Sequence, residues 1–242
     1  MNWTAIIGMA STFALLLPVC LVLIYRLYTN RSLQALLLYY LLTAAYNLMV
    51  QDILPASTNI KIIFGTVNNY LDAPLMLLFL LFFCVEKWKI KAIYITLAAF
   101  VAYELVIALV FGFSKEANVY ILGPGIIVVL LFSTVLFVRQ IKRTIVMGKG
   151  LGKTLMLTSV VFSYGCFGLI YLFHYIQRTR NIGDIFLLYF ISSFISSVLM
   201  AMGVALVRQH LRDLREIKLA RRELQVFFNN PVAMKRKPTH IP

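Results

Sequence analysis

Seven apolar blocks, each close to the length of a membrane-crossing helix, alternate with short polar segments along the chain. They cover about residues 5–25, 33–50, 62–85, 92–113, 119–138, 154–176 and 185–207. An α-helix needs about 20 apolar residues to cross the hydrocarbon core of a bilayer. No Lys or Arg lies inside any block. The pattern predicts an all-α polytopic membrane protein, with a seven-helix transmembrane domain over residues 1–207.

Composition excludes a soluble helical protein. The 242 residues are 61% hydrophobic, whereas soluble domains average about 45–50% apolar residues. Helices that are apolar on all sides offer no polar face to water, but in lipid they satisfy their own backbone hydrogen bonds. We therefore expect a multi-pass protein of the cell (inner) membrane.

The basic residues between the blocks are distributed unevenly. Most of the 23 Lys and Arg follow blocks one, three, five and seven, and the opposite segments hold only Lys61, Lys115, Arg178 and Arg180. Because cytoplasmic loops carry the excess of basic residues, the N-terminus is predicted outside and the C-terminus in the cytoplasm. The net charge of +14 is then expected to attract anionic lipid headgroups rather than nucleic acid.

Residues 208–242 are predicted to form a basic cytoplasmic tail. Its first part continues the last block as a helix to about residue 228, and the chain after Asn229-Asn230-Pro231 is expected to be disordered. Its apolar residues near one helical face are Leu211, Leu214, Leu224 and Phe228. Such a helix lies on the membrane or docks a cytoplasmic partner, and the alternative is a solvated basic anchor.

Polar residues inside the blocks mark the candidate site. Ionisable groups at membrane depth are costly, and the blocks contain only two acids, Asp72 and Glu104, with one histidine, His174. The other candidates are Asn47, Asn68, Asn69, Tyr103, Tyr171, Tyr189 and Ser193. They gather at the centre and outer half of the blocks. This asymmetry predicts an outward-facing polar pocket for a small ligand or a cation, with Asp72 as its deepest charge.

The two acids have no basic partner at membrane depth. Desolvation disfavours their charged forms, so one or both are expected to be protonated or to await a cation or a proton. The alternative for Asp72 is structural, because Pro74 frees a backbone carbonyl nearby. The serines of the last block are consistent with close helix packing.

One segment resembles a known family. Asn69-Tyr70-Leu71-Asp72-Ala73-Pro74-Leu75 resembles the third-helix signature of microbial (type 1) rhodopsins, which share the seven-helix outline and this orientation. The resemblance implies that Asp72 is the counterion and proton acceptor. However, block seven lacks the retinal-binding lysine, so the resemblance implies no covalent retinal. Asn69 replaces the family's arginine, the proline follows the acid too closely, and the only tryptophans are Trp3 and Trp88. A non-covalent carotenoid or a lipid is the remaining cofactor option.

Two classes of function fit these features. The first is a receptor or sensor with a pocket around Asp72, and the alternative is a cation- or proton-coupled transporter that uses Asp72 and Glu104. Neither inverted repeats nor paired broken helices are evident, which favours the sensor. An enzyme is not expected, because one intramembrane histidine is too few for a metal-hydrolase site, although an intramembrane hydrolase stays an alternative.

Overall fold

The computed structural model describes residues 3–112, 114–148, 150–173 and 182–229. Within these ranges the regular structure is helical and contains no strand. The long helices are α1 (Trp3–Ile24), α2 (Arg31–Val50), α3 (Thr58–Leu80), α4 (Lys87–Phe111), α5 (Lys115–Met147), α6 (Leu151–Tyr171) and α7 (Ile182–Asn229). Short 3₁₀ helices, η1 (Leu27–Thr29) and η2 (Leu81–Phe83), follow α1 and α3. Seven helices within these ranges are long and apolar enough to cross a membrane, which confirms the predicted all-α class and the number of membrane-length helices.

The helix ends differ from the predicted blocks because polar capping residues extend the helices. The side chains of Asn30, Ser57 and Ser114 each accept a backbone N–H and start α2, α3 and α5 before the apolar residues begin. At its other end α5 continues past the predicted end at 138. It stops at Met147, where Gly148 adopts the left-handed conformation with φ of 63°.

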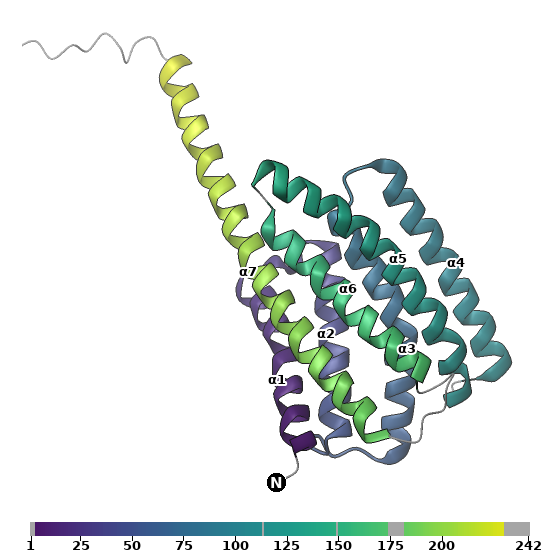
Figure 1. The fold of residues 1–242 in the computed structure, drawn as a ribbon. Coiled ribbons are helices and arrows are strands. Elements are labelled where there is room, and N and C mark those ends of the chain that lie inside the picture. Colours follow the sequence, from purple (N-terminus) through teal and green to yellow (C-terminus); the bar gives the residue numbers. More distant parts are fainter. Residues whose placement is uncertain (1–2, 113, 149, 174–181, 230–242) are drawn as a thin grey trace, which may run out of the picture.

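The last helix joins the final block and the tail into one element. α7 runs without a break for 48 residues from Ile182 to Asn229. Figure 1 shows it leaving the bundle at the end opposite the N-terminus. The side chains of the predicted apolar face of the tail, Leu211, Leu214, Leu224 and Phe228, and the segment predicted as disordered after 229 lie outside what the structure describes.

Six helices form a ring and the seventh lies outside it. Around the ring the main contacts run in the order α1, α2, α3, α5, α6, α7 and back to α1. α4 packs only against α3 and α5 among these main contacts, at the edge of the bundle in Figure 1. Of the most apolar stretch of α4, 17% is buried within the bundle, against 39–50% for the corresponding stretches of the other six helices. Residues that project from the inner sides of the ring helices therefore meet at the centre.

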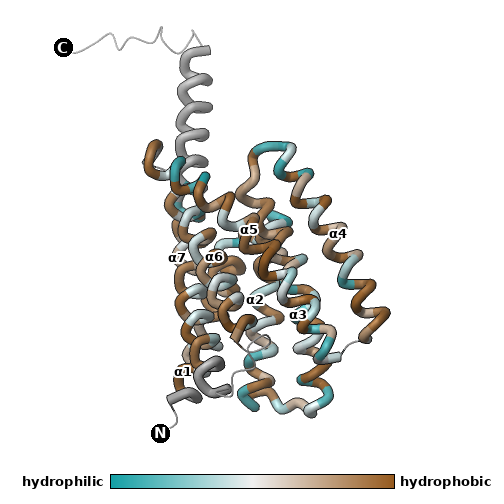
Figure 2. Tube along the Cα trace, turned by 45° about the vertical axis from the view of Figure 1, so that its right-hand side comes forward, coloured by the Kyte–Doolittle hydropathy of each residue, from teal (hydrophilic) through white to brown (hydrophobic). Residues whose placement is uncertain are grey.

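α4 presents a single stripe to its neighbours. Ile93, Phe100 and Glu104 are buried on it, whereas Leu105 and Leu109 face outward, with Leu109 87% exposed. Other apolar residues of α4, such as Val106 and Val110, are also exposed, at 57% and 67%, and the last turns of α4 are coloured hydrophobic in Figure 2. Glu104 is therefore directed toward the neighbouring helices rather than toward the outer surface of the bundle.

The closest helix contact joins α6 and α7. A Cβ atom on Gly203 would lie 2.8 Å from the carbonyl oxygen of Gly152 and 2.5 Å from Met156 Cγ. Small residues allow membrane helices to approach this closely. The buried serines of α7 share this helix, and Ser159 of α6 donates to the backbone carbonyl of Ser196 at 2.7 Å.

Candidate functional site

Asp72 lies near the middle of α3. It is about 21 Å from the start of the helix at Thr58, at a rise of about 1.5 Å per residue. This is deeper than the predicted block indicates, because the helix begins before residue 62. Ala73 and Met76 beside it are buried, and Asp72 itself is partly buried.

Two tyrosine hydroxyls meet at the Asp72 carboxylate. Tyr164 of α6, fully buried, donates a hydrogen bond to Asp72 Oδ2 at 2.8 Å. The hydroxyl of Tyr39 of α2 lies within hydrogen-bonding reach of the same group. Since α6 faces α3 across the ring, the carboxylate points into the bundle. The hydroxyls replace part of the hydration that a buried carboxylate loses.

Glu104 of α4, which lies outside the ring, is the second buried acid and an electrostatic neighbour of Asp72. It is 5% exposed, and its Oε1 atom has no hydrogen-bond partner among the described residues. Asp72 and Tyr70 of α3 are its electrostatic neighbours. The ion pairs within the described parts of the chain use Asp52 and Glu86 as their acids, so neither Asp72 nor Glu104 has a basic partner there. Buried acids without a basic partner favour the uptake of a proton or a cation nearby.

An aromatic chain leads from Asp72 to α7. The ring of Tyr164 contacts Phe167, with centroids 5.9 Å apart, and Phe167 stacks on Tyr189 of α7 at 5.7 Å. The Tyr189 hydroxyl donates to Asn47 Oδ1 of α2 at 3.4 Å. The predicted residues Asn47 and Tyr189 are thus brought together, and Tyr164 connects them to the acid.

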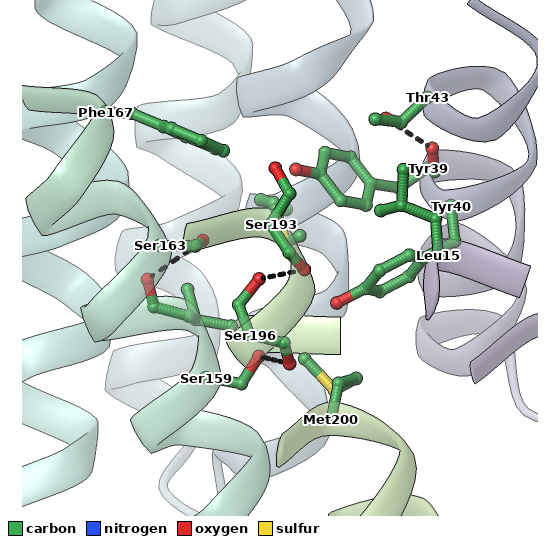
Figure 3. A pocket seen from close by; sticks show the side chains of 12 residues that line it. Leu15, Tyr39, Tyr40, Thr43, Ser159, Ser163, Phe167, Ser193, Ser196 and Met200 are labelled. Carbon is green, nitrogen blue, oxygen red and sulfur yellow. Dashed lines mark hydrogen bonds between the residues drawn. The ribbon is translucent and has the colours of Figure 1, made fainter. Parts of the chain in front are cut away.

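A small cavity lies beside this row of aromatic side chains. It measures about 10 Å³, and hydroxyl groups from α2, α6 and α7 surround it in Figure 3. Its polar lining consists of Tyr39, Tyr40, Thr43, Ser159, Ser163, Ser193 and Ser196. This volume holds about one water molecule, far below the ~300–1,000 Å³ of small-molecule pockets. Asp72 and Glu104 are not part of the lining, whereas Tyr39 lines the cavity and is also a neighbour of Asp72.

Two other predicted tyrosines bind the backbone of α5 instead. Tyr103 donates to the carbonyl of Tyr120 at 2.8 Å, and Tyr171 donates to the carbonyl of Val119 at 2.9 Å. Pro124 lies inside α5 and has no N–H to offer the carbonyl four residues before it. Tyr103 therefore supplies the donor that the proline removes.

The remaining candidates are less closely tied to Asp72. Asn68 and Asn69 are partly buried about one turn earlier on α3, and neither is among the described hydrogen-bond partners of Asp72. His174 lies outside the described residues. Ser193 is buried and lines the small cavity.

The principal partners of Asp72, Tyr39 and Tyr164, were not among the predicted site residues. A pattern in the sequence could have identified Tyr39 as a site residue. Tyr39, Thr43 and Asn47 occupy every fourth position and share one face of α2. Thr43 in turn donates to the Tyr39 carbonyl at 2.9 Å. Tyr164 is far from both ends of block six, which distinguishes it from tyrosines of the membrane interface.

Comparisons with protein-family models, curated proteins and solved structures find no match to this chain. Within the described residues, no group of three or more His, Cys, Asp and Glu side chains could hold a metal ion. The functional proposal therefore rests on the geometry around Asp72 and Glu104.

Proposed function

We propose that this chain is a multi-pass sensor of the cell (inner) membrane that responds to a proton or a small cation at Asp72 and Glu104. The observation that carries the proposal is the Asp72 carboxylate, which points into the ring, accepts the Tyr164 hydroxyl and has Glu104 as an acidic neighbour. The uneven distribution of basic residues supports an external N-terminus and a cytoplasmic C-terminus.

The charge balance of the site favours a positively charged ligand. Two neighbouring carboxylates repel each other when both are ionised, and no Lys or Arg lies in the apolar blocks to compensate. One proton or one small cation removes this repulsion. The cavity of about 10 Å³ beside Tyr39 has room for a water molecule but not for an organic ligand.

The contacts of Tyr164 connect Asp72 with α7, so they offer a route by which a proton or cation bound at Asp72 affects α7. A change in the charge of Asp72 changes the acceptor that the Tyr164 hydroxyl contacts. Tyr164 packs on Phe167, which stacks on Tyr189 of α7. Since α7 continues as one helix to Asn229, a small shift at Tyr189 is transmitted beyond the bundle, where a cytoplasmic partner would meet it.

A coupled transporter is the second candidate, and one observation favours it. α5 contains Gly123-Pro124-Gly125 at the level where Tyr103 and Tyr171 bind its backbone. Interrupted helices with freed carbonyls commonly form ion sites in transporters. In this alternative Asp72 and Glu104 carry the ion across.

The sensor is tested with the full chain reconstituted in nanodiscs. The infrared band of protonated carboxylic acids is followed against pH and against Na⁺ and K⁺, together with spin-label distances between α2 and α7. We expect a titrating band and a coupled distance change, both lost in Asp72→Asn and reduced in Glu104→Gln. Glu116→Gln, on the exposed first turn of α5, is the matched control and should leave both unchanged.

Proteoliposome flux separates the two candidates. Ion or proton flux that disappears in Asp72→Asn would establish transport and replace the sensor. If the carboxyl band and the α2–α7 distance are the same in the parent protein and in both variants, the site itself is refuted.

A further inference from the structure

A small polar space lies where α2, α6 and α7 meet. It is the cavity of about 10 Å³, and the part of the chain that the structure describes contributes no charged side chain to its wall. In Figure 3 the rings of Tyr39 and Tyr40 reach from α2 toward Ser193 and Ser196 of α7. The cavity is therefore polar but uncharged.

Several hydroxyl groups around the cavity donate their hydrogen to backbone carbonyls. Thr43 donates to the carbonyl of Tyr39 at 2.9 Å. Ser159 donates to the carbonyl of Ser196 at 2.7 Å, and Ser196 donates to the carbonyl of Ser193 at 3.2 Å. A hydroxyl oxygen that has donated its hydrogen keeps lone pairs that accept hydrogen bonds. The wall of the cavity is therefore rich in acceptors, and its complement is a hydrogen-bond donor.

The size and the polarity of the cavity favour water as its occupant. A space of about 10–15 Å³ holds one water molecule, which needs about 2–4 polar partners. Water offers two hydrogens to the hydroxyl oxygens, and its own oxygen accepts a hydrogen bond from a tyrosine. A bare cation would meet no carboxylate in this wall, and an unpaired charge away from bulk water is costly. The cavity therefore suits one water molecule.

Two side chains place the cavity next to the surroundings of Asp72. Tyr39 lines the cavity, and its hydroxyl lies within hydrogen-bonding reach of the carboxylate. Phe167 also lines the cavity and packs at 5.9 Å on Tyr164, which donates to Asp72 at 2.8 Å. A change at Asp72 therefore meets the wall of the cavity from α2 and from α6.

The acids are the groups near the cavity whose charge changes around neutral pH, because tyrosine hydroxyls keep their hydrogen there. Asp72 is the acid within reach of Tyr39, and Glu104 of α4 is the electrostatic neighbour of Asp72. Among the described residues, the titratable groups that face Asp72 or the cavity are Tyr39, Tyr40, Tyr164, Tyr189, Asp72 and Glu104.

We propose that this cavity binds one water molecule, held by hydroxyl oxygens of α2, α6 and α7, and that this water bridges Tyr39 to the serines of α7. When Asp72 takes up a proton, it is no longer a charged acceptor for the Tyr39 hydroxyl, which then donates to the water instead. Binding of the water is independent of the proposed sensing role, whereas its response to Asp72 rests on that role.

The water is tested by X-ray radiolysis of the full chain in nanodiscs. Radiolysis generates hydroxyl radicals from water inside a protein, so a fully buried methionine is oxidised quickly to its sulfoxide only when water lies beside it. Met200 of α7 lines the cavity and Met156 of α6 does not, and both are 0% exposed. We expect Met200 to be oxidised several-fold faster than Met156. Equal rates for the two methionines, or protection of Met200 by added Na⁺, would overturn the proposal.

Two variants of α7 test the position of the water. Ser196→Val fills the cavity with methyl groups and removes one hydroxyl, so the oxidation of Met200 should fall to the rate of Met156. Ser192→Val is the matched control, because Ser192 is also buried and also donates to the carbonyl three residues earlier, but does not line the cavity. Fast oxidation of Met200 in Ser196→Val, or equal slowing in both variants, would contradict the water site. If Ser196→Val does not fold, the two methionines of the parent protein still decide.

The bridge to Asp72 is measured by infrared difference spectra between neutral and acidic pH, in ordinary water and in water labelled with heavy oxygen. We expect a water O–H band that shifts with the label and accompanies the titration of the Asp72 carboxyl band. Tyr39→Phe should abolish the water band and leave the carboxyl band in place.

The two bands separate failure of the bridge from failure of the proposed function. A carboxyl band that titrates in the parent protein without a water band would overturn the bridge and leave the sensing role intact. A parent protein without a titrating carboxyl band would refute the sensing role and the bridge together, whereas the comparison of Met200 with Met156 would still decide whether the cavity holds water.

Discussion

The hydroxyl of Tyr164 donates a hydrogen bond to Asp72 Oδ2 at 2.8 Å and thereby joins α6 to α3 across the ring of helices. The two residues are 92 positions apart in the sequence. Tyr164 is fully buried, so its hydroxyl has few alternative partners when the carboxylate is lost. The contact is therefore both a packing constraint and the point at which a charge change at Asp72 reaches α6.

Tyr164→Phe should destabilise the bundle. The substitution removes one donor from a carboxylate in the interior, and hydrogen bonds to charged groups contribute about 2 kcal/mol. We expect a lower midpoint in thermal unfolding of the protein in nanodiscs. Tyr94→Phe, at a position of α4 that is 52% exposed, is the matched control and should leave the midpoint unchanged.

The cost of Tyr164→Phe should depend on Asp72. In an Asp72→Asn background the acceptor is neutral, so we expect the same substitution to cost less. A double-mutant cycle with additive effects would show that Tyr164 stabilises the bundle by packing alone, and the proposed route to α7 would lose its first step.

Tyr103→Phe should weaken the contact between α4 and α5. Its hydroxyl donates to the carbonyl of Tyr120, which Pro124 leaves without a helical N–H. We expect a loss of about 1 kcal/mol in the free energy of unfolding. In Pro124→Ala a backbone N–H can reach this carbonyl, so the loss should be smaller there. An equal loss in both backgrounds would contradict the assigned role.

The class of fold was predictable because apolar length alone determines it, whereas the partners of Asp72 were not. Asp72 and Glu104 stand out in sequence as the acids of otherwise apolar blocks. Their neighbours depend on helix order in the ring, and no pattern within one helix indicates that α6 faces α3 while α4 lies outside. The central position of Tyr164 in block six sets it apart from interfacial tyrosines, but the sequence does not indicate that it meets Asp72.

Gly203→Ala should destabilise the contact between α6 and α7. The added Cβ would lie 2.5 Å from Met156 Cγ and 2.8 Å from the Gly152 carbonyl oxygen, so backbone must move. Overpacking of this kind costs about 1–3 kcal/mol. Gly165→Ala is the control on α6, because no atom lies within 4 Å of its added Cβ. Equal unfolding midpoints for the two variants would refute the close approach.

The pairing of Glu86 with Lys89 and Arg139 predicts a pH dependence at one end of the bundle. The hydrogen bond from Lys89, with the positive charge of Arg139, lowers the pKa of Glu86 below its ordinary value of 4.5. A group whose pKa is lower in the folded protein stabilises it above the unfolded pKa, and this contribution is lost as the pH falls through the folded pKa.

The Glu86 contribution is measured by comparing unfolding midpoints of the parent protein and Glu86→Gln across pH. We expect the parent to be more stable near neutral pH, and the difference to shrink as the pH falls below about 4.5. Added salt at neutral pH should also reduce it, because the carboxylate is partly exposed to solvent. A difference that stays constant from neutral to acidic pH would show that Glu86 acts through its shape and not through its charge.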